Sequence, residues 1–497
     1  MNATCHDVVI VGAGLSGIGT ACHLVDRLPE TDFIILEGRE AMGGTWDLFR
    51  YPGIRSDSDM HTLGYHFKPW TDAKAIADGP AILDYIRETA TEYDVEHRIR
   101  YQHKLVAANW SSDSNEWLLT VAVGNDGDTR HIRCKFLLMC AGYYSYDAGH
   151  TPTFPGRERF TGDIVHPQEW PDELDYDDKT VVVIGSGATA VTLLPQLAKC
   201  AKHVVMLQRS PTYMISFPDE DIIANGLRRI LPEKTAYAIV RWKNIRLQNL
   251  MFRQATKRPN LARRLLVRHA RKVLGQDYDV DKHFNPTYNP WEQRLCLVPN
   301  DDFFEAIKSG DASVVTDTIE TFTADGIQLT SGDKLPADII ITATGLNVVP
   351  MGNATFAVDG EEVDFSKRYA YKGIMMEGVP NVISTFGYIN ASWTLRADLV
   401  AQFACRLLDH MREHNLKRVT PTLRDSDKGM TTKPWVEGFS SGYLQRVMHT
   451  LPKQGDREPW LNPQNYLGDR ARFLKAPLDD GVLDFGPTQQ RVATHDQ

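Results

Sequence analysis

The sequence predicts an α/β fold with two dinucleotide-binding, Rossmann-like domains and an inserted helical subdomain. Two glycine patterns predict the domains, because each follows a short β-branched run and precedes a helix-compatible stretch, and they lie 173 residues apart. A basic, helix-compatible interval after the second pattern predicts the insert. A length of 497 residues allows about three folding units.

The first module begins with the apolar run Val8–Val11 and the glycines Gly12, Gly14 and Gly17. Gly12 permits a tight turn, Gly14 lets backbone N–H groups approach a pyrophosphate, and Gly17 allows close helix packing. The next strand ends in Glu37, 25 residues after Gly12, where a carboxylate can accept hydrogen bonds from both hydroxyls of an adenosine ribose. We expect a dinucleotide site here; the alternative is a buried strand-turn-helix packed by glycines.

The second module repeats the pattern at Gly185 and Gly187, with Ala190 in the third small position. Its second strand ends in Arg209 and Ser210, with no acid at the tip. A carboxylate would repel a 2′-phosphate, whereas these two side chains can bind one, so we expect NADPH rather than NADH. The alternative is a solvated cation at a strand end.

Two further strand-and-glycine segments, 136–142 and 338–345, stand just before each expected crossing between the modules. We expect them to lead into the connections. They could instead be core strands that end in glycine.

Composition excludes several classes of protein. A net charge of −9 with 24% charged residues argues against nucleic-acid binding, and 36 Gly and 26 Pro are ordinary globular values. No apolar run approaches the roughly 20 residues that span a bilayer. The seven cysteines include no C-x-x-C pair and no Cys/His cluster at metal spacing, so we expect reduced thiols, a cytoplasmic protein and no metal.

Two long gapped motifs occur: GGxWxxxxYPGxxxD over residues 43–57 and FxGxxxHxxxWP over residues 160–171. With them the chain resembles the type I Baeyer–Villiger flavin monooxygenases, which belong to the class B flavoprotein monooxygenases. Flavin-containing monooxygenases usually carry Tyr or Phe where this chain has Trp170. The stretches TWDLFRYPGIRSDSDM, YNPWEQRLCLVPN, GYINASWTL and LPKQG look closest to the mycobacterial ethionamide-activating subgroup.

The resemblance implies FAD and NADPH as cofactors, with O2 and a small ketone or sulfide as substrates. Ketones would become esters or lactones through a C4a-peroxyflavin, and thioethers or thioamides would be sulfoxidised. One alternative is a flavin-containing monooxygenase that oxidises only N or S nucleophiles. Another is a non-catalytic flavoprotein redox sensor.

Arg294 and Asp57 are the expected catalytic residues. The family arginine that matches Arg294 stabilises the peroxide anion and the charge that develops later, and the acid that matches Asp57 orients it. A permanently charged guanidinium in a dry pocket suits that task. The alternative is a plain structural ion pair. Many relatives carry Lys where this chain has Gln293, so we expect weaker discrimination against NADH.

The expected cofactor contacts are wider than these two residues. For FAD they are Gly12, Gly14, Ser16, Gly17, Glu37, Thr45, Trp46, Asp47, Leu48, Asp57 and Leu105. For NADP they are Arg55, Ser56, Asp57, Gly185, Ser186, Gly187, Ala188, Thr189, Ala190, Arg209 and Ser210. His166 and Trp170 are interpreted as a linker that couples the domains rather than as catalytic residues.

Residues 222–274 contain 14 Lys/Arg and Glu233 as the one acid, with apolar residues at helical spacing. Pro232 and Pro259 predict a division into short helices. In the family this interval is a helical subdomain that covers the substrate entrance, so we favour a packed lid over contact with an anionic membrane.

The expected domains are FAD-binding at 1–150 and 351–497, NADPH-binding at 151–215 and 301–350, and the helical insert at 216–300. Loops around residues 388–393 should help to shape the pocket. Trp393, Trp435 and Trp460 could each line a pocket or fill a core, and we favour the core for each. The oligomeric state is left open.

Overall fold

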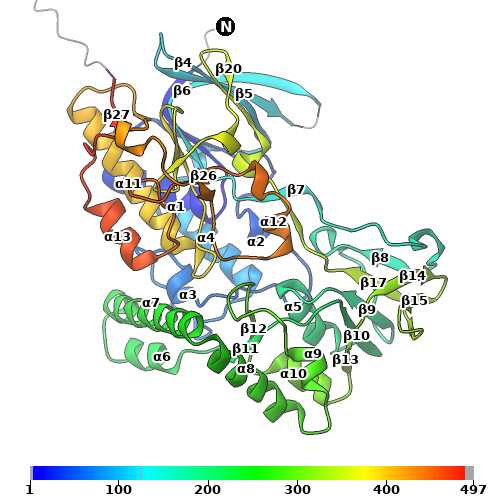
Figure 1. The fold of residues 1–497 in the computed structure, drawn as a ribbon. Coiled ribbons are helices and arrows are strands. Elements are labelled where there is room, and N and C mark those ends of the chain that lie inside the picture. The colour runs from blue at the N-terminus through cyan, green and yellow to red at the C-terminus, as the bar shows by residue number, and fades with distance from the viewer. Residues whose placement is uncertain (1–3, 125, 487–497) are drawn as a thin grey trace, which may run out of the picture.

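The structure is a computed structural model that describes residues 4–124 and 126–486. In Figure 1 one sheet occupies the upper part of the molecule, a second sheet lies to the right, and the helices α6 to α10 run along the lower edge. The predicted fold class is confirmed. Within the described residues, no helix is long and apolar enough to cross a membrane.

The larger sheet has the strand order β20-β19-β4-β5-β6-β1-β2-β3, with β23 paired to β6. Its strands are β1 (Cys5–Val11), β2 (Phe33–Leu36), β3 (Ile99–Arg100), β4 (His103–Ser111), β5 (Glu116–Val123), β6 (Asp128–Met139), β19 (Thr355–Val358), β20 (Glu361–Glu362) and β23 (Val382–Ser384). Since β19, β20 and β23 come from residues after 350, both ends of the chain build this sheet.

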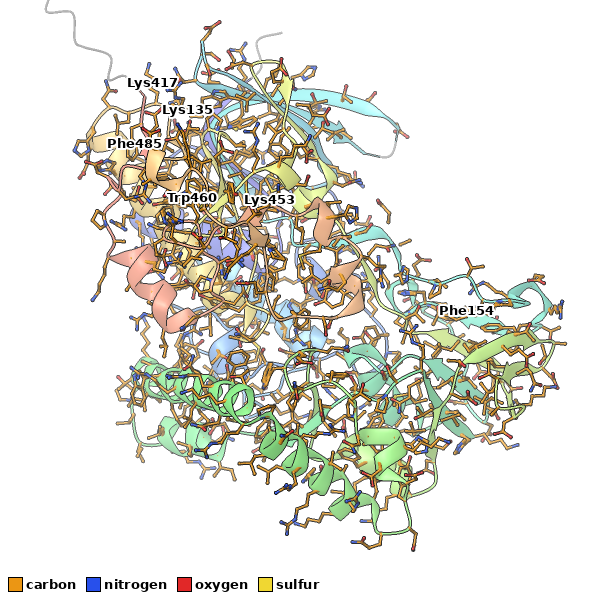
Figure 2. The ribbon with its side chains drawn as sticks, viewed as in Figure 1. Lys135, Phe154, Lys417, Lys453, Trp460 and Phe485 are labelled. Carbon is orange, nitrogen blue, oxygen red and sulfur yellow. The ribbon has the colours of Figure 1, made fainter. Side chains whose placement is uncertain are left out.

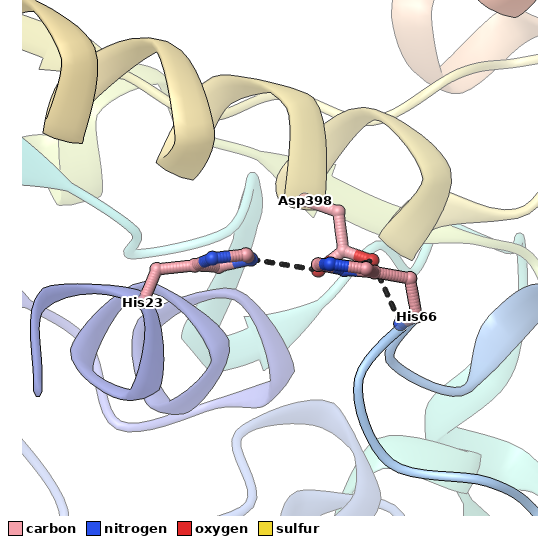
Figure 3. Close-up of side chains that lie close together, drawn as sticks. All are labelled: His23, His66 and Asp398. Atoms are coloured by element: carbon pink, nitrogen blue, oxygen red, sulfur yellow. Dashed lines mark hydrogen bonds and ion pairs between the residues drawn. The ribbon is translucent and has the colours of Figure 1, made fainter. Parts of the chain in front are cut away.

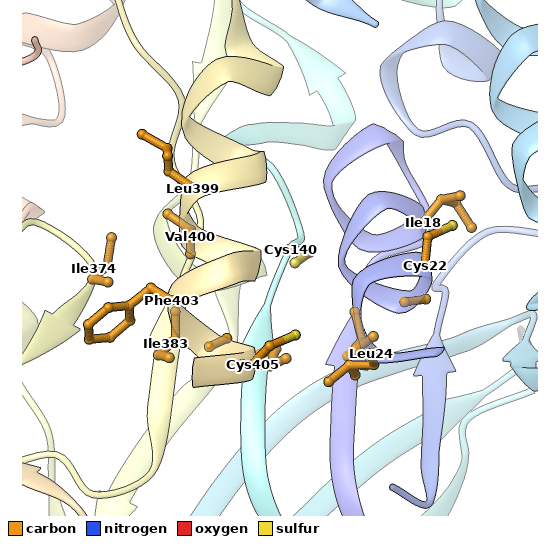
Figure 4. Packing of buried hydrophobic residues seen from close by; sticks show 14 of the residues in the cluster. Ile18, Cys22, Leu24, Cys140, Ile374, Ile383, Leu399, Val400, Phe403 and Cys405 are labelled. Atoms are coloured by element: carbon orange, nitrogen blue, oxygen red, sulfur yellow. The ribbon is translucent and has the colours of Figure 1, made fainter. Parts of the chain in front are cut away.

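Helices α1 (Leu15–Arg27) and α11 (Trp393–Glu413) pack against each other beside this sheet. Figure 4 shows Leu24 of α1 and Phe403 of α11 in one apolar cluster, and both side chains are fully buried. Burying such a side chain contributes about 1.5–3 kcal/mol, so the packing of α1 against α11 is a main link between the N-terminal and C-terminal segments.

The smaller sheet has the order β13-β10-β9-β17-β8, and its pairs are all parallel. Its strands are β8 (Asp163–Val165), β9 (Thr180–Ile184), β10 (His203–Gln208), β13 (Ala312–Thr316) and β17 (Ile339–Thr342). The continuous apolar run Val181–Ile184 is buried, as expected for a parallel strand with covered faces. Helices α5 (Ala188–Leu197) and α10 (Asp302–Lys308) contact the strands of this sheet.

Short elements complete the two parts. The other strands are β11 (Met214–Phe217), β12 (Cys296–Pro299), β14 (Ile319–Thr323), β15 (Gly326–Leu329), β16 (Lys334–Pro336), β21 (Ala370–Tyr371), β22 (Met375–Met376), β24 (Thr420–Pro421), β25 (Lys433–Pro434), β26 (Lys453–Gln454) and β27 (Leu483–Asp484). The other helices outside the insert are α2 (Thr45–Leu48), α3 (Met60–Leu63), α4 (Gly79–Glu92), α12 (Gly442–Gln445) and α13 (Tyr466–Leu474). Figure 2 shows Trp460 within the upper part and Phe154 beside the smaller sheet.

A two-stranded ribbon connects the two parts. β7 (Tyr144–Gly149) leaves the larger sheet after β6, and β18 (Leu346–Val348) returns after β17; the two strands pair antiparallel. His166 lies against this ribbon, where its Nε2 is 3.2 Å from the carbonyl oxygen of Gly345. A Cβ on Gly149 would lie 1.9 Å from the His166 ring, so the ring packs directly on the ribbon.

The interval between β11 and β12 is helical, with α6 (Ile222–Arg228), α7 (Glu233–Lys257), α8 (Pro259–Leu274) and α9 (Val280–Phe284). Breaks occur at Pro232 and Pro259, as predicted, but the expectation of short helices is wrong for α7, which has 25 residues. No Gly or Pro occurs between the two prolines, so the helix continues without a break, and its inner face is anchored. Arg241 donates hydrogen bonds to the carbonyls of His61 and Gly64, at the end of α3.

A charge cluster around the buried Asp398 joins four segments of the chain at this point. Figure 3 shows three of its members, His23, His66 and Asp398. Asp398 of α11 accepts hydrogen bonds from His23 of α1 (3.3 Å), from His66 (3.1 Å) and from Arg241 of α7 (3.3 Å). Burial raises the pKa of Asp398, but the bonds from the two histidines outweigh burial and hold it well below the usual range. Although two His and one Asp resemble metal ligands, the guanidinium already supplies the positive charge that this carboxylate needs.

Candidate active site

The first nucleotide loop joins β1 to α1. Gly12 has φ +101°, and a Cβ there would lie 2.6 Å from the carbonyl oxygen of Cys140. A Cβ on Gly17 would lie 1.8 Å from the carbonyl oxygen of Gly12, so helix α1 meets the turn with no room for a side chain. Gly14 caps α1 without a side-chain hydrogen bond, which leaves the N–H groups of the first turn open to an anion.

Glu37 follows β2 and is buried at the edge of this loop. Its carboxylate accepts hydrogen bonds from the backbone N–H of Ala13 (2.8 Å) and of Arg39 (2.9 Å). Burial raises the pKa of Glu37 despite these two bonds. The acid is therefore held in one orientation at the tip of the strand.

The second nucleotide loop joins β9 to α5 in the same way. Gly185 has φ +133°, and a Cβ there would lie 2.3 Å from the carbonyl oxygen of Ala343. Gly187 caps α5 without a side-chain hydrogen bond and has open space around it. Arg209 and Ser210 follow β10 and are exposed.

Both loops open into one cavity of about 1340 Å³. Of the expected contacts, the wall includes Gly12, Gly14, Ser16, Glu37, Thr45, Trp46, Arg55, Ser56, Asp57, Leu105, Gly185, Ser186, Gly187, Ala188, Thr189, Arg209 and Ser210. Four expected contacts, Gly17, Asp47, Leu48 and Ala190, lie outside the wall. Gly17 and Ala190 pack the helices, and Leu48 packs against the core of the smaller sheet. Asp47 is buried and paired with Arg39 at 2.8 Å.

Arg294 and Asp57 meet in the wall between the two loops. Arg294 Nε lies 3.2 Å from Asp57 Oδ2; 44% of the arginine side chain is exposed, toward the cavity, against 12% of the aspartate. Partial burial opposes the charged form of Arg294, but the Asp57 carboxylate favours it, and the net pKa lies above the ordinary value. The arrangement presents a fixed positive charge to the space that both loops enclose.

Arg55, an expected NADP contact, is already paired with a carboxylate of the protein. Its Nη1 lies 2.8 Å from Asp302 Oδ2 on α10, and its Nη2 donates to the carbonyl of Leu297. It therefore fastens the loop before Asp57 to the part of the molecule that holds the second nucleotide loop. A phosphate would have to compete with Asp302 for this guanidinium.

Sequence reasoning missed several aromatic residues of the wall. Trp393 lines the cavity and donates a hydrogen bond to Ser16 Oγ at 2.7 Å, so the expectation that it fills a core is wrong. Trp435 and Trp460 are buried in the core, as expected. Tyr143 and Tyr144 also line the cavity, with hydroxyls 2.5 Å apart. Their sequence signal is the position directly after the strand-and-glycine segment 136–142.

The helices of the insert contribute nothing to this wall, although Gln293, Arg294 and Cys296 at the end of the range 216–300 line it. None of the described residues 216–292 lines the cavity, against the expectation of a lid over the entrance. Residues 388, 389, 391 and 393 do line it, as expected for that stretch.

Comparisons with known proteins give a consistent picture. The flavin-binding monooxygenase-like family matches residues 72–351, and an NAD(P)-binding Rossmann-like domain family matches residues 10–76. The FAD-containing monooxygenase EthA of Mycobacterium tuberculosis (strain CDC 1551 / Oshkosh) is 54% identical over 480 residues, which cover 96% of this chain and 97% of that protein.

Two solved structures share the fold. An oxidized steroid monooxygenase bound to NADP superposes with a TM-score of 0.72 at 22% identity, covering 84% of this chain and 88% of that one. OTEMO in complex with FAD and NADP superposes with a TM-score of 0.71 at 20% identity, covering 85% and 88%.

Proposed function

The chain belongs to the flavin-binding monooxygenase-like family, and from this premise we propose that it is an NADPH-consuming, FAD-dependent Baeyer–Villiger monooxygenase. Its substrates would be ketones, converted to esters or lactones, with sulfoxidation of thioethers and thioamides as a second activity. The observation that carries the proposal is the Arg294–Asp57 pair in the wall of a cavity shared by two nucleotide loops.

FAD and NADP are its cofactors, in agreement with the prediction from the sequence. The loops fit such groups, because α1 and α5 each begin at a glycine with no side-chain cap, and their first-turn N–H groups can bind a pyrophosphate. We assign FAD to the loop with Glu37, whose fixed carboxylate suits two ribose hydroxyls. We assign NADPH to the loop with Arg209, whose exposed charge suits a 2′-phosphate.

We also propose the domain division that this assignment implies: FAD at 1–150 and 351–497, NADPH at 151–215 and 301–350, and the insert at 216–300. The larger sheet draws its strands from both parts of the first pair of ranges. The parallel pair β11–β12 closes the insert at its base. Free cysteines at all seven positions are in keeping with a reducing compartment such as the cytoplasm.

When bound, reduced FAD supplies activated oxygen to the substrate, and NADPH supplies the electrons. The task of the chain is to stabilise negative charge on the reacting oxygen atoms. Arg294 can do so because its guanidinium stays charged and Asp57 holds it in place before the reaction begins, so no reorganisation is needed. Half-buried Tyr143 and Tyr144, whose pKa values burial raises, keep their protons. Since one hydroxyl donates to the other, the remaining O–H can donate a hydrogen bond into the same space.

The test is a panel of simple methyl ketones and sulfides with the purified holoenzyme, scored by product mass and by NADPH consumption. We expect an ester from the ketone. An enzyme that oxidises the sulfides but leaves every ketone unchanged would be an oxidase of N and S nucleophiles only, and the proposal would be wrong.

Variants assign the role of the arginine. Arg294→Ala should lower ester formation on the order of a hundredfold or more, the usual loss for a donor that stabilises a reacting oxygen, while NADPH oxidation continues. Asp57→Asn should give a smaller loss of the same kind. Arg446→Ala, which removes another arginine of the wall, is the matched control. An equal loss in that control would mean that Arg294 and Asp57 are a structural ion pair.

A further inference from the structure

The surface of α6, α7 and α8 carries most of the exposed large apolar side chains of the described residues. Nine of the thirteen lie in residues 222–265. They are Ile222, Ile223, Ile230, Ile239, Trp242, Leu247, Leu250, Leu261 and Leu265, with exposures between 43% and 79%. Apolar side chains that gather in this way mark an interaction surface.

On α7 this surface lies opposite the face that packs on α3. Tyr237, Arg241 and Asn244 face inward and are buried, with Asn244 bonded to Asp59 at 2.9 Å. Ile239 and Trp242 stand on the other side of the helix and are exposed; Trp242 is 61% exposed. The inner face therefore fastens the helix, and the outer face has no partner among the described residues.

Helix α8 repeats the arrangement. Val267 and Ala270 are its buried residues, whereas Leu261 and Leu265 are exposed on the opposite side. Because α7 contacts both α6 and α8, the exposed sides belong to one helical layer along the lower edge of Figure 1.

Cations are interleaved with these apolar side chains. Nine exposed Lys/Arg make no ion pair with any described residue: Arg229, Lys234, Arg246, Arg253, Lys257, Arg258, Arg264, Arg268 and Lys272. Glu233 is the one acid in residues 222–274. The layer is thus strongly positive, in a chain whose net charge is −9.

We propose that the outer surface of α6, α7 and α8 docks on a lipid bilayer that carries anionic headgroups. The combination fits that partner, because the Ile, Leu and Trp side chains can enter the acyl boundary while Arg and Lys contact the headgroups. Arg246 already stacks on Trp242, with its Cζ 5.4 Å from the ring centroid, as suits a side chain at such an interface. The acidic remainder of the molecule is repelled, which orients the protein with this layer downward on the membrane.

Two other partners fit less well. A nucleic acid would use the cations but would leave the apolar side chains in water. A second copy docked through the same surface would place like charge against like charge.

Co-sedimentation of the full-length holoenzyme with vesicles tests the proposal. We expect binding to vesicles of phosphatidylcholine mixed with phosphatidylglycerol, little binding to phosphatidylcholine alone, and release at high salt. Trp242→Ser/Leu265→Ser should lower the binding at least tenfold. The matched control is Val106→Ser/Leu118→Ser, which removes two exposed apolar side chains from the larger sheet and should bind as the wild type does.

Charge is tested separately. Arg246→Gln/Arg264→Gln/Arg268→Gln should lose binding to the anionic vesicles, whereas Arg130→Gln/Lys417→Gln/Lys475→Gln, three exposed cations elsewhere, should keep it. Flavin absorbance and melting temperature report that each variant is folded. The proposal is overturned if the wild type does not bind anionic vesicles, or if either variant of the layer binds as well as its control. It is also overturned if the layer instead mediates self-association, seen by sedimentation velocity without vesicles.

Discussion

The two nucleotide loops share one backbone design and differ in what surrounds it. In the first, Gly17 touches the turn and Glu37 is buried and held by two backbone N–H groups. In the second, the equivalent position is Ala190, whose methyl group is buried, and Arg209 is exposed. On the proposed assignment, the difference teaches that the fold supplies the phosphate site twice, whereas the residue at the strand tip chooses which adenosine is bound.

The largest effect on stability should come from the third small residue of the glycine patterns, which is Gly17 in the first loop and Ala190 in the second. Gly17→Ala places a Cβ 1.8 Å from the carbonyl oxygen of Gly12, so we expect a loss of more than about 4 kcal/mol in the free energy of unfolding and no flavin-loaded protein. Ala190→Gly should cost about 1 kcal/mol. Thermal unfolding and flavin content measure both. Similar losses in the two variants would mean that the loops are equally tight.

Arg209→Ala should act on the second loop alone. We expect kcat/KM for NADPH to fall about tenfold, because charge-assisted hydrogen bonds to the 2′-phosphate are lost, with kcat/KM for NADH nearly unchanged. Flavin content should stay at the wild-type level. If Arg209→Ala still strongly prefers NADPH, Arg209 does not select the coenzyme.

Gln293→Lys tests coenzyme selection in the opposite direction, because it should strengthen the preference for NADPH. The residue lines the cavity next to Arg294, and a second cation there should raise the preference for NADPH over NADH by about threefold. Steady-state kinetics with both coenzymes measure the ratio. Gln293→Met, which adds no charge, is the control and should leave the ratio unchanged.

A further difference between the two modules is the dependence of stability on pH. Burial lowers the pKa of His23 on α1, so the folded protein keeps this residue neutral while the unfolded chain takes up a proton below about pH 6.5. Stability should therefore fall as pH drops below 6.5, by up to about 1.4 kcal/mol per pH unit until the lowered pKa of the folded state is reached. Helix α5 of the second loop contains no ionisable side chain and has no such dependence.

His23→Gln should make the unfolding temperature less sensitive to pH between 7 and 5. His131→Gln, at an exposed position on β6, is the control. A variant with the slope of the wild type would place the acid sensitivity elsewhere.

Local patterns predict the parts of the fold that depend on neighbours in the sequence. Both strand-turn-helix units, Glu37 and Arg209 lie where the glycine patterns indicate, since turn geometry is set within a few residues. Other features depend on distant contacts. Arg55 pairs with Asp302, 247 positions away, and Trp393 reaches Ser16 across 377. The length of α7, in contrast, has a local signal, since no Gly or Pro occurs between Pro232 and Pro259.

The pairing of β23 with β6 has a consequence for synthesis on the ribosome. The strands of the smaller sheet lie between residues 163 and 342 and can associate as soon as that interval has emerged. The larger sheet must wait with the last three residues of β6, 137–139, unpaired on one side and with α1 lacking α11 until residues 382–413 arrive. A nascent chain stalled before residue 380 should thus expose an unpaired, aggregation-prone strand edge. The N-terminal segment is therefore the part most in need of a chaperone.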